Sequence, residues 1–172
     1  KYDEAGVACD MAIEIDPQFA KAWNNKCLAL NYQGKYDEAG VACDMAIEID
    51  PQFAKAWNNK CLALNYQGKY DEAGVACDMA IEIDPQSAGA WINKCLALAD
   101  QGRYDEAEVA CDTAIEIDPK IAIAWNNKGY ALSGQGKYAE AIKAFDRATE
   151  LDPQFAGAWS NKGAALCHLG RY

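Results

Sequence analysis

The sequence predicts an all-α solenoid built from antiparallel helix pairs. Three observations favour this fold. Tryptophan recurs every 34 residues from Trp23 to Trp159, and proline recurs with the same period from Pro17 to Pro153. Residues 1–52 are also identical, letter for letter, to residues 35–86. A fixed period of this length is typical of arrays in which each unit buries its apolar face against its neighbours.

Each period contains two helical patterns separated by a glycine. Apolar residues follow helical spacing over residues 54–64 and again over residues 70–81, with Gly68 between the two stretches. We expect Asp50 to cap the first of these helices, Pro51 to lie in its first turn, and Gly68 to end it in the left-handed conformation. Because the connection is short, the two helices should pack antiparallel.

The period divides the chain into four complete units and two half units. We expect a second helix alone in residues 1–19, helix pairs in residues 20–53, 54–87, 88–121 and 122–155, and a first helix alone in residues 156–172. The two halves complement each other. A first helix of one copy stacked on a second helix of another would rebuild a unit, which predicts head-to-tail self-association.

Composition restricts the classes of partner. The net charge of -10 and the pI near 4.5 disfavour nucleic acid and anionic membrane surfaces, because both would be repelled by the summed field. No apolar run approaches the roughly 18 residues that a membrane helix needs. We therefore expect neither a nucleic-acid partner nor a membrane span.

Seven of the eight cysteines follow the period, namely Cys9, Cys27, Cys43, Cys61, Cys77, Cys95 and Cys111. Gly129 and Phe145 replace them in the last complete unit, which favours a packing role. We expect buried, reduced thiols and hence a cytoplasmic protein. The alternative is a metal or disulfide role for Cys27 and Cys43, which could face each other across a helical hairpin. Since no CxxC or CxxH pair is present, we expect no metal and no cofactor.

One repeat signature covers the whole chain. In residues 122–155 its positions hold Trp125, Lys128, Gly129, Leu132, Ala141, Phe145 and Pro153. With this period, the chain resembles the tetratricopeptide repeat family, although Lys128 and Leu132 replace the usual Leu and Tyr. The resemblance implies a right-handed superhelix with the first helices on its concave wall. It also implies that the partners are other proteins or peptides.

One asparagine recurs at every first helix, forming an asparagine ladder of Asn25, Asn59, Asn93, Asn127 and Asn161. The ladder persists although the residue before it changes, and asparagine costs a helix about 0.5 kcal/mol relative to alanine. Its amides could hold the backbone of an extended peptide, as in the similar ladder of the repeat domain of O-GlcNAc transferases. Alternatively, they could bond to neighbouring helices and fix the spacing of the units. Both interpretations are open.

Further candidates for peptide contact lie near the ladder on the first helices. They are Asn24, Asn58, Asn126, Leu28, Leu62, Tyr32, Tyr66 and Tyr130. No catalytic constellation accompanies them, since His168 is the one histidine and no Gly-rich phosphate loop is present. The sequence therefore predicts a non-catalytic scaffold that binds a peptide segment in a concave groove. The alternatives are a self-assembling head-to-tail array and a substrate-recruiting region of a larger enzyme.

Overall fold

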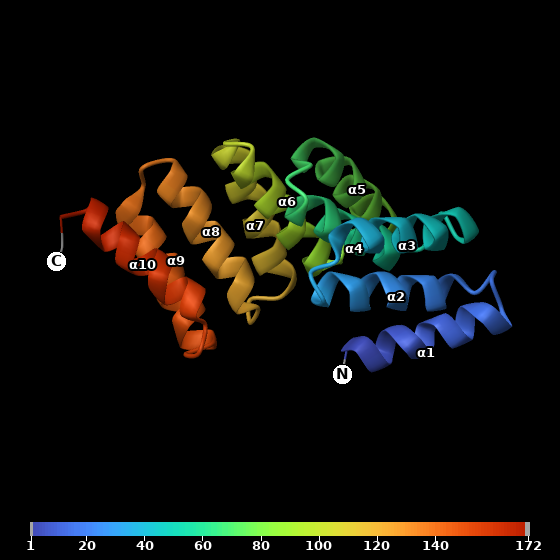
Figure 1. Cartoon of the computed structure of the whole chain (residues 1–172). Coiled ribbons are helices and arrows are strands. Elements are labelled where there is room, and N and C mark those ends of the chain that lie inside the picture. The colour runs from blue at the N-terminus through green and yellow to red at the C-terminus, as the bar shows by residue number, and fades with distance from the viewer. Residues whose placement is uncertain (1, 171–172) are drawn as a thin grey trace. The chain divides into compact units, whose positions relative to one another are not determined.

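The computed structural model describes residues 2–170, which form ten helices and no strand (Figure 1). The helices are α1 (Tyr2–Ile15), α2 (Ala20–Tyr32), α3 (Tyr36–Ile49), α4 (Ala54–Tyr66), α5 (Tyr70–Ile83), α6 (Ala88–Asp100), α7 (Tyr104–Ile117), α8 (Ala122–Gly134), α9 (Tyr138–Leu151) and α10 (Ala156–His168). The prediction of an all-α repeat fold is confirmed. Within this range, no helix is long and apolar enough to cross a membrane.

The helices form two compact units, Lys1–Gln86 with α1 to α5 and Ser87–Tyr172 with α6 to α10. In the first unit, α2 packs against α3 and α4 against α5, and α1 and α3 each pack against the helix that follows. In the second unit, α6 to α9 each pack against the next helix in the chain. The even-numbered first helices of each unit also contact one another, as α2 does with α4. Each core therefore extends from one repeat to the next.

The turn inside each repeat depends on a glycine. Gly34 has a φ of 73°, and its backbone N–H donates to the carbonyl of Asn31 while that of Lys35 donates to the carbonyl of Leu30. These two bonds satisfy the last carbonyls of α2, in the motif that commonly ends a helix at a left-handed glycine. The prediction for Gly68 is confirmed, since its φ is 75°.

The turn between repeats differs from the expectation. Asp50 does not cap α4 and Pro51 does not lie in its first turn, because α4 begins at Ala54 and Phe53 occupies the N-cap position. Instead, Asp50 ends α3, and its Oδ1 accepts a hydrogen bond from the backbone N–H of Gln52 at 3.1 Å. Such a local turn is a strong preference of aspartate. The indole Nε1 of Trp57 donates to the carbonyl of Pro51 at 3.0 Å, which ties α4 to this turn. The same pair of hydrogen bonds recurs around Trp23, Trp125 and Trp159.

Disulfides join the two helices of three repeats, as Cys27–Cys43, Cys61–Cys77 and Cys95–Cys111. The expectation of reduced thiols is wrong for these six residues. The paired positions face each other across the hairpin with 5.3 Å between their Cα atoms, which is within the range for a disulfide. The alternative that paired Cys27 with Cys43 is right. The argument from reduced thiols to the cytoplasm loses its premise, since disulfides are typical of oxidising compartments.

The fourth complete repeat fills the same place with an aromatic ring. A Cβ atom added to Gly129 would lie 2.5 Å from the ring of Phe145, which is buried. The glycine therefore makes room for the phenylalanine, and the two residues replace a disulfide together. In the part of the chain that the structure describes, Cys9 and Cys167 are the free cysteines.

Candidate functional site

The first helices share one row of side chains that we call the inner face. In α2 this row consists of Asn25, Leu28 and Tyr32, whose spacings of three and four residues place them on one side of the helix. In the first unit the equivalent residues of α4 are Asn59, Leu62 and Tyr66. In the second unit they are Asn93, Leu96 and Asp100 in α6, Asn127, Tyr130 and Gly134 in α8, and Asn161, Ala164 and His168 in α10.

The asparagine ladder is bonded to the neighbouring first helices. Asn59 donates from its Nδ2 atom to Oδ1 of Asn24 at 3.0 Å, and Asn161 donates in the same way to Asn126 at 3.0 Å. In both pairs the acceptor lies in the preceding repeat, 35 residues before the donor. It is the asparagine that comes directly before the ladder asparagine of that repeat. Asn59 and Asn127 are buried, Asn93 and Asn161 are half-buried and Asn25 is exposed, while Asn24 and Asn126 are buried and Asn58 is half-buried.

One member of the ladder lacks this acceptor. The residue 35 positions before Asn127 is Ile92, which is itself buried. As a result, the Nδ2 atom of Asn127 has no hydrogen-bond partner among residues 2–170, although its Oδ1 accepts from Asn126 at 3.2 Å. Sequence reasoning missed this acceptor position. The only signal in the sequence was the second series of asparagines, Asn24, Asn58 and Asn126. Helical periodicity does not show which residue of a neighbouring helix an asparagine contacts, so this signal could not be interpreted.

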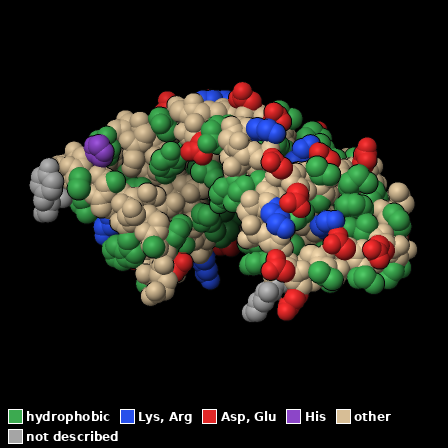
Figure 2. Space-filling view, in the orientation of Figure 1, with side chains coloured by type: hydrophobic (Ala, Val, Ile, Leu, Met, Phe, Trp, Pro, Cys, Tyr) green, Lys and Arg blue, Asp and Glu red, His purple; other side chains and the backbone are tan. Residues whose placement is uncertain are grey.

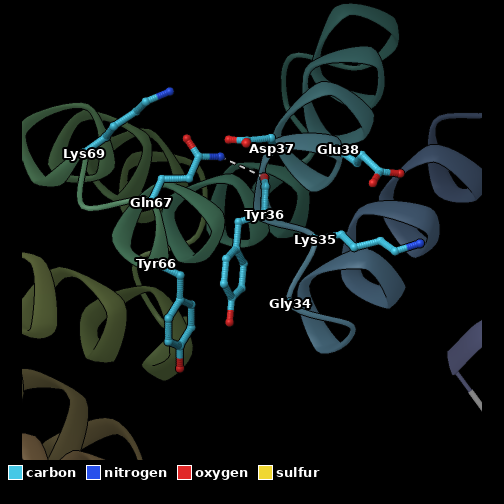
Figure 3. Close-up of a pocket in the computed structure, with 8 residues that line it drawn as sticks. All are labelled: Gly34, Lys35, Tyr36, Asp37, Glu38, Tyr66, Gln67 and Lys69. Carbon is cyan, nitrogen blue, oxygen red and sulfur yellow. Dashed lines mark hydrogen bonds between the residues drawn. The ribbon is translucent and has the colours of Figure 1, made fainter.

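The predicted tyrosines are partly exposed, and the hydroxyl group of Tyr130 donates to Oδ1 of Asp100 at 3.2 Å. The exposed fractions of Tyr32, Tyr66 and Tyr130 are 60%, 58% and 39%. Figure 3 shows the first unit, where the rings of Tyr66 and Tyr36 stack at 4.8 Å and Gln67 donates to the carbonyl of Tyr36 at 2.8 Å. These side chains border an open pocket of about 400 Å³ at the turns after α2 and α4. Leu28 and Leu62 are half-buried.

A second pocket, of about 270 Å³, lies between α8, α9 and α10 in the second unit. Residues of the inner face form much of its wall, and Tyr138 of α9 adds a further ring. We call it the α8–α10 pocket. Its lining includes Tyr130, Ser133, Gly134, Tyr138, Ala164 and His168.

Two lysines of the first helices, Lys26 and Lys60, pack against neighbouring side chains. Lys26 bridges to Asp10 of α1 at 2.7 Å, and its Nζ atom lies 5.5 Å from the ring centre of Trp23. Lys60 makes the same pair of contacts, with Asp44 and Trp57. The acidic second helices therefore partly neutralise Lys26 and Lys60.

Two carboxylates of α7 have a perturbed pKa. A hydrogen bond from Arg103 lowers the pKa of Glu106. Partial burial raises the pKa of Glu108, but hydrogen bonds from Gln135 at 2.8 Å and Lys137 at 3.2 Å outweigh it, so the pKa lies below its ordinary value. Glu108 belongs to α7, at the edge of the turn after α8, and its role there is to hold two helices together. Among the described residues, no group of three or more His, Cys, Asp or Glu side chains could hold a metal ion.

Comparison with known proteins identifies the repeat. The family model of the tetratricopeptide repeat matches residues 20–53, 54–87, 88–121 and 122–155. No curated protein matches the chain in sequence.

Several solved structures share the fold. YrrB, a TPR protein with an unusual peptide-binding site, superposes with a TM-score of 0.72 at 23% identity, over 97% of this chain and 86% of its own. PilW, a type IV pilus biogenesis factor, gives a TM-score of 0.88 at 21% identity, and the superposition covers 99% of this chain and 79% of PilW. The APC/C hetero-tetramer Cut9–Hcn1 gives 0.90 at 18% identity, over 98% of this chain and 34% of that one. At these identities the likeness concerns the fold alone.

Proposed function

Because the chain belongs to the tetratricopeptide repeat family, we propose that it is an interaction scaffold that holds a peptide segment of a partner protein against its inner face. The observation that carries this proposal is the exposure of Tyr32, Tyr66 and Tyr130 on that face. Large aromatic side chains in solvent are enriched where proteins bind one another, because each ring buries much apolar area at a low cost in side-chain entropy. YrrB, which shares the fold, has a peptide-binding site.

The asparagine ladder then divides into two roles. Asn59 is buried and donates to Asn24 of the preceding first helix, so we assign to it the spacing between first helices. The exposed Asn25 is the member of the ladder that we assign to a peptide backbone, since an amide offers both donors and an acceptor. A hydrogen bond of this kind contributes about 0.5–1.5 kcal/mol. Aromatic contacts must therefore supply most of the affinity.

The test begins with peptides selected from a random display library on the immobilised chain. Fluorescence anisotropy then measures the affinity of a selected peptide for wild type and for the triple variant Tyr32→Ala, Tyr66→Ala, Tyr130→Ala. We expect at least a tenfold loss, because each truncated aromatic anchor costs about 1 kcal/mol or more.

A matched control is available on the second helices. Val41, Val75 and Val109 are about two-thirds exposed there, at 64%, 64% and 66%. Their triple substitution by alanine should leave the affinity unchanged. Equal losses in the two triple variants, or no selected peptide at all, would contradict binding at the inner face.

A second candidate function, head-to-tail self-association, is favoured by exposed apolar residues at both terminal helices. On α1, Met11 and Ile15 are exposed, Ile15 by 82%, whereas the corresponding Met45 and Ile49 of α3 are half-buried. On α10, Trp159 is half exposed. We propose that α10 of one copy packs against α1 of another, as α8 packs against α9 within a unit.

Sedimentation velocity between about 10 μM and about 1 mM tests this contact. The mean sedimentation coefficient should rise with concentration for wild type and stay constant for Ile15→Glu. Val41→Glu, at an exposed position of α3, serves as the control and should behave as wild type. A monomer across the whole range would exclude the contact.

A further inference from the structure

Three side chains that line the α8–α10 pocket are smaller than their counterparts in the first unit. The chain offers an internal comparison, since each position from residue 103 onward has an equivalent 102 residues earlier. Ser133, Gly134 and Ala164 correspond to Asn31, Tyr32 and Leu62. The first unit therefore has an amide, a phenol ring and an isobutyl group where the second has a hydroxymethyl group, a hydrogen atom and a methyl group.

The freed space is only partly taken up by the protein itself. A Cβ atom on Gly134 would lie 2.3 Å from the ring of Tyr104, which shows that this ring has settled against the glycine backbone. Gly134 also lines the α8–α10 pocket, which has a volume of about 270 Å³. Pockets for drug-sized ligands span roughly 300–1,000 Å³. The size of this one therefore suits a single large side chain.

The walls favour an aromatic occupant. The rings of Tyr138 and His168 stack with 4.9 Å between their centres and an angle of 8°, and Tyr130 adds a partly exposed ring. Buried Phe145 and Ala165 also line the pocket. Aromatic rings prefer to stack on or pack edge-on against other rings, which adds to the gain from burying their area.

The polar groups favour an occupant with a hydroxyl group. In the first unit, Asn31 donates to the carbonyl of Asn59 at 3.0 Å. Ser133 stands in its place, and within the described part of the chain the buried Oγ atom of Ser133 has no hydrogen-bond partner. A buried hydroxyl group without a partner is unfavourable, and a ligand hydroxyl group would supply one.

Charge excludes an ionised occupant. None of the described residues that line the pocket is Lys, Arg, Asp or Glu. Figure 2 shows that the visible face around α8 and α10 is mostly apolar or uncharged, whereas charged side chains of both signs gather over the first unit. A side chain that enters this pocket gains no ion pair there and should be neutral.

From these features we infer that the α8–α10 pocket takes the phenol ring of a tyrosine side chain from a bound partner segment. This inference rests on the proposed function, because it names the side chain that the inner face selects. The ring packs against Tyr130, Tyr138 and His168, and its hydroxyl group bonds to Ser133.

The experiment uses p-cresol, the side-chain analogue of tyrosine, as the probe and follows the ring protons of His168 by NMR. Since the chain has one histidine, this signal reports on the pocket without further assignment. We expect a saturable shift with p-cresol. Toluene, which lacks the hydroxyl group, should bind about threefold to tenfold more weakly, because the loss of one hydrogen bond changes the affinity by about that factor.

Two variants and a control locate the effect. Ala164→Leu restores the residue of the first unit and should abolish the saturable shift by filling the pocket. Ser133→Ala should remove the preference for p-cresol over toluene while leaving both able to bind. Ser160→Leu places an equally large side chain at an exposed position of α10 that does not line the pocket, and it should behave as wild type. Circular dichroism confirms that each variant is folded.

The outcomes separate this inference from the proposed function. A shift that stays linear with concentration, or that survives in Ala164→Leu, overturns the pocket as a binding site. Equal affinities for p-cresol and toluene in wild type overturn the assignment to tyrosine. If selected peptides bind the inner face while p-cresol does not saturate, the inference fails and the function stands. If p-cresol binds and no peptide is selected, the function fails.

Discussion

At the scale of single residues, buried amides fix the spacing between first helices. Asn24 accepts the hydrogen bond of Asn59, and both are buried, whereas the adjacent Asn25 is exposed. We expect Asn24→Ala to lower the free energy of unfolding by about 1–3 kcal/mol, because it leaves the amide of Asn59 without an acceptor. Asn25→Ala should change it by less than about 0.5 kcal/mol. Urea denaturation of both variants measures the difference, and equal effects would argue against the bond.

Glu108 gives the stability a dependence on pH. Its pKa is lowered in the folded state, so its contribution is present above the unfolded pKa, near 4.5, and is lost as the pH falls through the folded value. Glu108→Gln should lower the free energy of unfolding at pH 7 by at most about 1 kcal/mol, the usual range for partly exposed pairs. The difference from wild type should shrink below about pH 4.5. Urea midpoints from pH 3 to pH 7 check this, and a difference that grows on acidification would refute it.

At the scale of helix pairs, small residues control how closely the helices approach. Gly129 and Gly163 occupy the same position of successive repeats, but their surroundings differ. A Cβ atom on Gly129 would meet the ring of Phe145, whereas one on Gly163 meets no described atom within 4 Å. We expect Gly129→Ala to destabilise the protein by about 1–3 kcal/mol through overpacking. Gly163→Ala should stabilise it by up to about 1 kcal/mol, since alanine favours the helix. Thermal denaturation separates the two, and effects of the same sign would contradict the account.

The disulfides make three of the hairpins sensitive to reduction. Each closes a loop between cysteines 16 residues apart, which stabilises a hairpin by about 3 kcal/mol. A reductant should therefore accelerate amide exchange in the pairs α2–α3, α4–α5 and α6–α7, whereas α8–α9, with Phe145 in that place, serves as an internal control. Without reductant, alkylation should label Cys9 and Cys167. Labelling of all eight cysteines would show that the disulfides are not formed.

At the scale of the whole molecule, the chain divides into two compact units. Cys27, Leu30 and Cys43 belong to a buried cluster of the first unit, and Leu132 and Phe145 to one of the second. Because repeat arrays are stabilised by contacts between neighbours, we expect residues 1–86 and 87–172, expressed separately, each to remain helical and to unfold cooperatively. Circular dichroism with thermal denaturation measures this. A half without helical structure would contradict it.

The sequence by itself determined the repeat, the helices and the turns inside each repeat. A period of 34 residues and a left-handed glycine such as Gly68 are local signals, so they need no knowledge of distant contacts. The sequence was less informative at Asp50, because an aspartate before a helix can either cap it or form a local turn. In the structure Asp50 forms a turn with Gln52 and does not cap the next helix.

Only the tertiary structure decided which side chains meet. Cysteines 16 residues apart form disulfides, and asparagines 35 residues apart form hydrogen bonds, because the hairpin and the stacking of repeats bring them together. The α8–α10 pocket also follows from packing, since it depends on Ser133, Gly134 and Ala164 lying around one space. Helical periodicity shows which face of a helix is apolar. Partners across helices depend on the direction and size of each side chain, and these are settled only when the helices pack.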